Sequence, residues 1–139
     1  MNEPKAKMFL IRFPYWLGIA ADAFWAVVLL LPSVYGVMSG NPDFVPDMQT
    51  IQFMRVGGIL MSGWTILLLW AVRSPIERRF VILLTAFPVV FGLFLVALDS
   101  YLNGNTFLIW ILIKTAILFA SMIHSYILAG KVKRSFGPA

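Results

Sequence analysis

The sequence predicts an all-α integral membrane protein, a single domain of four transmembrane helices packed as a bundle. The chain is 60% hydrophobic and only 12% charged, whereas a soluble domain carries about 25% charged residues. Its apolar residues gather in four runs, each near the roughly 20 residues that a helix needs to cross a bilayer. The connections between these runs are too short for a second domain, so we expect one domain over residues 1–139.

The first transmembrane helix is expected over residues 15–37. Pro14 suits a helix start, and Pro32 should kink or loosen the far end. Steps of three or four residues gather polar-tipped and small side chains on one face, opposite a lipid-facing surface of Val, Leu, Ile and Ala. Because this face carries the helix's one charge, on Asp22, it should turn away from lipid. The face comprises Tyr15, Gly18, Asp22, Trp25, Leu29, Ser33 and Gly36.

The second helix is expected over residues 51–72, with Arg55 near its first turn. Gly58 and Ser62 lie four residues apart and form a small-xxx-small pair, and Thr65 continues their face. Small residues let helix backbones approach closely in lipid, where packing replaces the hydrophobic effect. We therefore expect this face to contact another helix.

The third helix is expected over residues 75–102. Ser74, Pro75 and Glu77 have the spacing of an N-cap, a first helical residue and the partner of a capping box. This spacing predicts a helix start at Pro75. Farther along, Pro88 should free a backbone carbonyl in mid-membrane, which a neighbouring polar group would have to satisfy.

The fourth helix is expected over residues 106–130 and carries two unusual side chains, Lys114 near its middle and the chain's only histidine, His124. A cation inside hydrocarbon costs roughly 2.5 kcal/mol or more, so Lys114 must face protein, water or a partner charge. The main question for the fourth helix is therefore which groups pair with Lys114 and His124.

The distribution of basic residues predicts the orientation of the chain. Lys and Arg gather on the cytoplasmic side of a membrane protein. One predicted side has only Arg55, and the other collects Lys5, Lys7, Arg12, Arg73, Arg78, Arg79, Lys131, Lys133 and Arg134. Both termini are therefore expected in the cytoplasm. Because this pattern explains the net charge of +5, the bilayer is the expected partner and nucleic acid is not.

Counting helical rise at about 1.5 Å per residue sorts the intramembrane charges into two clusters. Asp22 and His124 fall in the cytoplasmic half, whereas Lys114 falls in the outer half with Asp99 and Arg55 near the outer boundary. Each cluster could order the bundle, handle protons or a ligand, or face a partner subunit. These five residues are the candidate site.

Four further residues on the helices that carry Asp22 and His124 are candidates to line a cavity: Trp25, Trp110, Ser121 and Ser125. A metal site is not expected, because one histidine without cysteine or nearby carboxylate clusters does not supply a ligand set. The chain has no cysteine, which excludes disulfides and thiolate sites. We also find no motif for a cofactor and expect none.

The chain resembles small four-helix bacterial inner-membrane proteins of the DoxX-like kind. The resemblance rests on length, on Pro32 near the end of the first helix, and on the Arg-Val-Gly-Gly opening of the second helix, Arg55–Gly58. It implies a four-helix architecture in the bacterial inner membrane. Some members of that group are linked with quinone-dependent oxidation, so the resemblance places a quinone among the substrates to consider.

Three classes of function follow from these features. The first is an accessory or binding protein that holds a partner subunit or a lipid-like ligand between its helices. The second is a small homo-oligomeric transporter or channel that moves a proton, ion or small solute past the polar residues. The third is a membrane enzyme acting on a lipid or quinone, with Asp22 and His124 as acid and base. We rank them in that order, because 139 residues seldom enclose a complete pathway.

Overall fold

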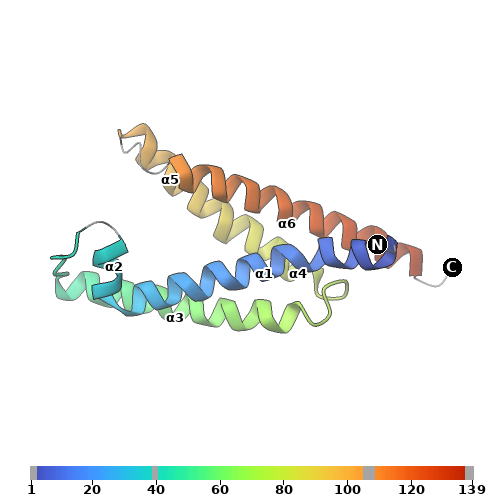
Figure 1. The fold of residues 1–139 in the computed structure, drawn as a ribbon, viewed down its shortest axis with the longest axis horizontal. Coiled ribbons are helices and arrows are strands. Elements are labelled where there is room, and N and C mark those ends of the chain that lie inside the picture. Colours follow the sequence, from blue (N-terminus) through green and yellow to red (C-terminus); the bar gives the residue numbers. More distant parts are fainter. Residues whose placement is uncertain (1–2, 39–40, 105–108, 137–139) are drawn as a thin grey trace. The chain divides into compact units, whose positions relative to one another are not determined.

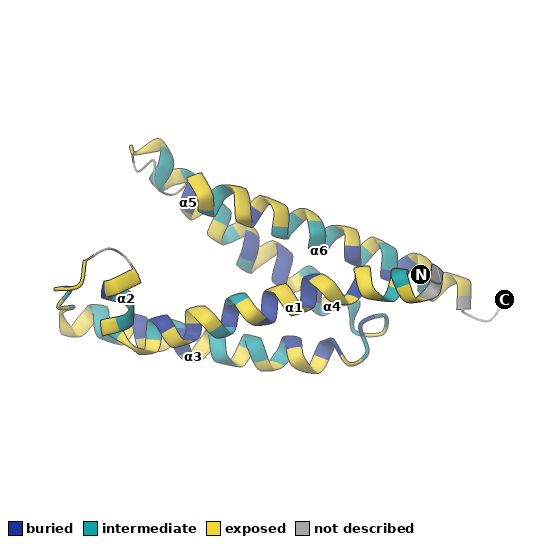
Figure 2. Ribbon diagram, in the orientation of Figure 1, coloured by how far each residue is buried: buried dark blue, intermediate teal, exposed yellow. Residues whose placement is uncertain are grey.

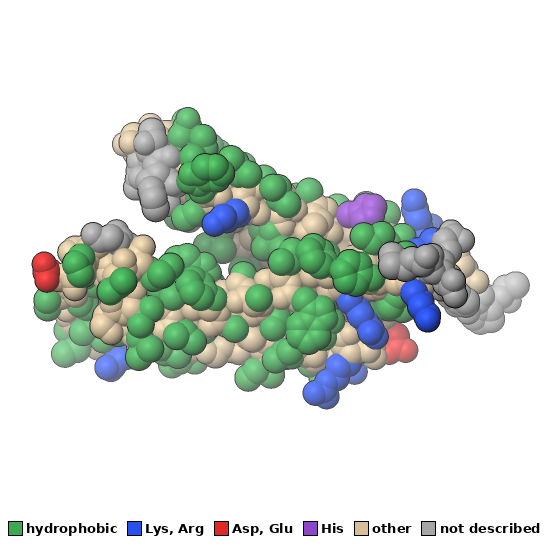
Figure 3. Space-filling model, viewed as in Figure 1, with side chains coloured by type: hydrophobic (Ala, Val, Ile, Leu, Met, Phe, Trp, Pro, Cys, Tyr) green, Lys and Arg blue, Asp and Glu red, His purple; other side chains and the backbone are tan. Residues whose placement is uncertain are grey.

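The computed structural model describes residues 3–38, 41–104 and 109–136, and every regular element in this part of the chain is a helix. Four of its helical stretches are long and apolar enough to cross a membrane: Lys5–Leu30, Met48–Ala71, Arg79–Leu102 and Ile109–Ser135. Figure 3 shows hydrophobic side chains over most of the visible helical surface. The predicted all-α class and the four apolar spans are thus confirmed, and they are compatible with a multi-pass membrane protein.

The chain divides into two compact units. The first unit combines Met1–Leu17 with Trp70–Ala139, and the second is Gly18–Leu69. The boundary at Gly18 falls inside the continuous helix α1 (Glu3–Leu30), so this helix contributes to both units. Along the helices, buried positions alternate with exposed ones (Figure 2).

The second unit contains the later part of α1 followed by α2 (Pro32–Met38) and α3 (Met48–Ala71). The predicted interruption at Pro32 is confirmed, since α1 ends at Leu30 and a separate helix begins at Pro32. Within this unit α1 and α3 lie side by side (Figure 1). They approach each other closely at Gly58, where an added Cβ would lie 2.7 Å from Leu30 Cγ and 3.3 Å from the Ala26 carbonyl oxygen. The expected helix contact at the small-residue face is therefore present.

The first unit contains the beginning of α1 together with α4 (Arg79–Leu84), η1 (Thr85–Phe91), α5 (Gly92–Leu102) and α6 (Ile109–Phe136). α6 packs against all three segments of the preceding span. The buried apolar residues Ile82, Ala86, Val90 and Ala97 line that span. Phe119 of α6 adds an edge-to-face contact with Phe87, with ring centroids 5.5 Å apart.

The starts of the first and third spans differ from the expected ones. α1 begins at Glu3 and therefore contains Pro14, whereas the sequence favoured Pro14 as the start. The predicted start of the third span at Pro75 is wrong, because residues 72–78 form turns and α4 begins at Arg79 with no side-chain cap on Arg78. The expected start of the fourth helix, at 106, lies outside the described residues.

α3 starts at Met48, slightly before the expected position, because Asp47 caps it. The Thr50 backbone N–H donates to Asp47 Oδ1 at 2.7 Å, and the Ile51 N–H donates to the Asp47 carbonyl at 3.0 Å. This is the geometry of an N-cap residue, whose side chain satisfies an otherwise unpaired N–H of the first turn. Aspartate is a common N-cap residue, so Asp47 was a signal for this helix start. The neighbouring Pro46 instead led us to predict a loop.

Pro88 lies in η1, a π-helical segment inside the third span. A π-helix bonds each N–H to the carbonyl five residues earlier instead of four. In this register the residue after the proline can reach the carbonyl that the proline nitrogen cannot satisfy. The expected side-chain partner is therefore replaced by a change of backbone register, and the nearby Thr85 hydroxyl donates elsewhere, to the Val81 carbonyl at 2.9 Å.

We expect Gly58→Val to destabilise the protein by about 1–3 kcal/mol, the usual cost of overpacking a tight contact. Unfolding in a fixed mild detergent, followed by circular dichroism, measures this loss. Gly63→Val is the matched control on the same helix, because nothing in the described chain lies within 4 Å of a Cβ there. Equal stability of the two variants would contradict the close α1–α3 contact.

We expect the first turn of α3 to loosen in acid. Hydrogen bonds from the Thr50 side chain and backbone lower the pKa of Asp47 below its ordinary value of 3.8. The stabilisation is therefore complete above that ordinary value and is lost as the pH falls through the lower, folded-state pKa. The protection factor of the Thr50 amide should drop in acid, and Asp47→Ala should remove it at neutral pH. Asp43→Ala, in the same connection, should leave protection unchanged, and a similar loss there would contradict capping by Asp47.

Candidate functional site

Asp22 is the only charged side chain among the buried residues of the described chain. It lies on the stripe of α1 that also contains Ile19 and Ala26, and it is 7% exposed. Its Oδ2 atom has no hydrogen-bond partner among the residues described. Burying an ionised carboxylate without a partner is strongly unfavourable. The position therefore calls for a proton or a donor that the described residues do not supply.

The packing of α1 on α3 shows what else lies at the level of Asp22. Close contacts join Gly58 to Ala26 and Leu30, and the two helices run in opposite directions (Figure 1). One helical turn back along α1 leads from Ala26 to Asp22, and one turn forward along α3 leads from Gly58 to Ser62. Ser62, followed by Thr65, is thus at the height of the carboxylate.

Both of these hydroxyl groups donate to their own helix. Ser62 Oγ donates to the Gly58 carbonyl and Thr65 Oγ1 donates to the Met61 carbonyl, each at 2.8 Å. A hydroxyl has only one proton to donate, so each oxygen is left as an acceptor. These two hydroxyls therefore offer acceptors and no free proton at the level of Asp22. A ligand that fits it brings a donor or a positive charge.

The four other predicted charges lie on exposed positions. His124 and Lys114 are on α6, Asp99 is on α5 and Arg55 is on α3. Asp22 belongs to the second unit and His124 to the first, so their predicted pairing stays a prediction. The outer cluster stays a prediction for the same reason, because Arg55 belongs to the second unit.

The four cavity candidates have different surroundings. Trp25 is 39% exposed and Trp110 is 65% exposed, and a cavity beside either tryptophan stays a prediction. Ser121 Oγ donates to the Leu118 carbonyl of its own helix at 2.8 Å. Ser125 is 1% exposed and donates across the first unit to the Ile11 carbonyl, also at 2.8 Å. Ser125 thus joins α6 to the beginning of α1.

Two arginines next to this junction are held on aromatic rings, which the sequence reading missed. Arg78 lies 3.7 Å from the centroid of the Trp70 ring and donates to the Trp70 carbonyl at 2.5 Å. Arg79 lies 5.2 Å from the Tyr126 ring centroid. Cation–π contacts of this kind need a ring within about 6 Å. The available signal was an aromatic residue on each adjoining helix, Trp70 at the end of α3 and Tyr126 in the second half of α6.

Tyr15 completes this junction by donating to the Arg78 carbonyl at 3.4 Å. Together with the Ser125 bond to Ile11, this contact brings the beginning of α1, the turn before α4 and the end of α6 to one end of the first unit. All nine basic residues that the topology argument placed on one side belong to these three segments of this unit. We call it the basic end of the first unit.

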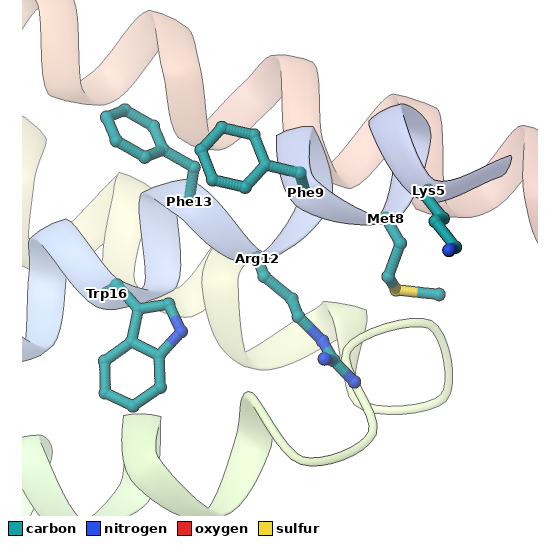
Figure 4. A pocket seen from close by; sticks show the side chains of 6 residues that line it. All are labelled: Lys5, Met8, Phe9, Arg12, Phe13 and Trp16. Carbon is teal, nitrogen blue, oxygen red and sulfur yellow. The ribbon is translucent and has the colours of Figure 1, made fainter. Parts of the chain in front are cut away.

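A hollow of about 360 Å³ opens along α1 at this end (Figure 4). Its lining combines two basic side chains with apolar and aromatic ones and includes no acidic residue. The lining residues are Lys5, Met8, Phe9, Arg12, Phe13 and Trp16. All belong to the first unit, so the hollow is separate from Asp22.

We expect Ser125→Ala to destabilise the protein by about 0.6 kcal/mol, the average measured for interhelical hydrogen bonds in a membrane protein, where the largest value is about 1.7 kcal/mol. Ser121→Ala removes only a bond within its own helix and should change stability less. Unfolding in mixed micelles with increasing SDS compares the two variants directly. If Ser121→Ala cost as much as Ser125→Ala, the bond to Ile11 would not hold α1 and α6 together.

No family model, curated protein or solved structure matches this chain. The DoxX-like resemblance therefore stays a prediction, and the function has to be argued from the residues themselves.

Proposed function

We propose that this chain is a multi-pass protein of the bacterial inner membrane that acts as an accessory or ligand-binding bundle, with Asp22 as its contact to a partner subunit or lipid-like ligand. One observation carries the proposal: a carboxylate that is 7% exposed lies within an apolar span and has an oxygen without a partner among the described residues. An ionisable residue inside a membrane is a functional candidate by default.

The hydrogen-bond acceptors near Asp22 limit the chemistry of the partner or ligand that could bind there. Asp22 can accept hydrogen bonds, and the Ser62 and Thr65 hydroxyls have already given their protons to their own helix. A partner helix with a hydroxyl, amide or basic side chain would fit, and so would a lipid-like molecule with a hydroxyl or amine. An anionic group would be repelled there.

The proposed orientation places both termini in the cytoplasm. Support comes from the basic end of the first unit, where hydrogen bonds join the three segments that carry nine of the eleven Lys and Arg residues. The positive-inside rule assigns such an end to the cytoplasm. Arg78 and Arg79, stacked on Trp70 and Tyr126, would then lie at the headgroup level, where amphipathic aromatic rings are enriched.

A small homo-oligomeric transporter or channel is the second candidate. The observation that favours it is the same oxygen-lined level, since a carboxylate with hydroxyl oxygens can also hold a proton or a hard cation. The third candidate, an enzyme acting on a lipid or quinone, requires Asp22 and His124 in one cavity. That enzyme would need His124, which is exposed, to reach the same substrate as Asp22.

Asp22→Asn should weaken binding of the copurifying partner or ligand about ten- to hundredfold, because hydrogen bonds to charged groups contribute about 1.5–3 kcal/mol. Native mass spectrometry of protein gently extracted from its own membrane measures this as lost occupancy. Asp43→Asn, an exposed carboxylate in the connection before α3, is the matched control and should retain full occupancy. A wild-type protein without any bound component, or equal occupancy in both variants, would refute the binding role.

Flux into proteoliposomes separates the transporter from the binding protein. A transporter should appear as a homo-oligomer, and its proton or ion flux should disappear in Asp22→Asn while the helical content stays constant. A binding protein should show no flux above empty liposomes for either form. Flux that persists unchanged in Asp22→Asn would exclude a pathway through this carboxylate.

A further inference from the structure

We propose that the hollow at the beginning of α1 binds the headgroup of an anionic phospholipid. The inference goes beyond the proposed function and does not depend on Asp22. The lining residues follow steps of three and four along one helix face, from Lys5 through Arg12 to Trp16. In Figure 4, Met8, Arg12 and Trp16 extend from the same side of the helix. The helix itself therefore presents both charge and apolar surface to one ligand.

The two cations of the lining are open to a ligand. Lys5 and Arg12 are exposed, and within the described residues no hydrogen bond or ion pair occupies either of them. A guanidinium can grip a phosphate through two parallel N–H bonds, and an ammonium adds a point charge. Seven residues separate them, or roughly 10 Å along the axis. Flexible side chains can close that distance around one headgroup.

The rest of the lining distinguishes a lipid from a free phosphate ion. Phe9 is 60% exposed, Phe13 is 45% exposed and Trp16 is 54% exposed. A hydrated inorganic ion gains nothing from these rings, whereas the glycerol and upper acyl chain of a lipid would cover them. Tryptophan also favours the headgroup level of a bilayer, where its ring is apolar and its N–H remains wet.

A neighbouring face of this helix segment holds the hollow in place. Ile11 and Tyr15 are fully buried, and they make the hydrogen bonds to Ser125 and to the Arg78 carbonyl. Arg12 and Trp16 each follow one of these anchored residues, so they are turned about 100° away from the buried face and are exposed. The remaining cations of the basic end add to the attraction for the anionic lipids of a cytoplasmic leaflet.

The test is lipid binding to the purified full-length protein, measured by native mass spectrometry with phosphatidylglycerol and phosphatidylcholine of identical acyl chains. Wild type should prefer phosphatidylglycerol, and Lys5→Gln/Arg12→Gln should weaken that binding about tenfold or more, since each basic residue near an anionic surface contributes about 1 kcal/mol. Lys133→Gln/Arg134→Gln is the matched control, with equal charge loss at the same end of the first unit, and should retain the preference. Circular dichroism confirms that each variant is folded.

Two results would overturn the proposal. Equal loss in both double variants would show that net charge alone attracts the lipid, with no site in the hollow. Displacement of phosphatidylglycerol by millimolar inorganic phosphate would show that the cations bind a phosphate ion and that the aromatic lining contributes nothing. Phe9→Ser/Phe13→Ser gives an independent check, because it should weaken lipid binding while keeping both cations.

Discussion

A backbone in hydrocarbon has to satisfy its hydrogen bonds within the protein. This constraint accounts for the backbone structure of the apolar spans and for the hydrogen bonds of their hydroxyl groups. It explains why every regular element described is helical. It also explains the treatment of proline: Pro32 falls where one helix ends and the next begins, and Pro88 falls in a π-helical segment whose register suits a missing N–H. The same constraint directs the hydroxyl groups of Ser62, Thr65 and Thr85, which return to their own helices.

Against this background Asp22, Ser125 and Tyr15 stand out among the described residues, because the two hydroxyls donate outside their own helices and the carboxylate is buried. Ser125 donates to a different helix and thereby joins α6 to α1. Asp22 is buried, and its Oδ2 atom has no hydrogen-bond partner among the described residues. A helix that only needed packing at this level would be better served by an apolar side chain, since a half-satisfied polar site is worse than none. The presence of the carboxylate is therefore an argument for an occupant.

The sequence predicted the helical class and the four apolar spans because composition and run length depend little on context. The sequence-based prediction was wrong at helix starts, where a few neighbouring residues can favour different structures. The Ser74–Glu77 spacing matches a capping box, yet turns extend to Arg78, and Asp47 was overlooked beside a proline. In the candidate site, helical periodicity was enough to place Asp22 on an inward face. The bond from Ser125 to the Ile11 carbonyl, by contrast, joins residues far apart in the sequence, so it depends on how the helices pack, and periodicity carries no such information.

α1 links the two features that carry functional arguments. Its first part is anchored through Ile11 and Tyr15, and its later part packs against α3 near Gly58. Arg12 and Asp22 are ten positions apart on this one continuous helix, about 15 Å by helical rise. A lipid headgroup held at Arg12 would set the depth of α1 in the bilayer. Because Asp22 is on the same helix, we expect that depth to influence how far its carboxylate would lie from the headgroups.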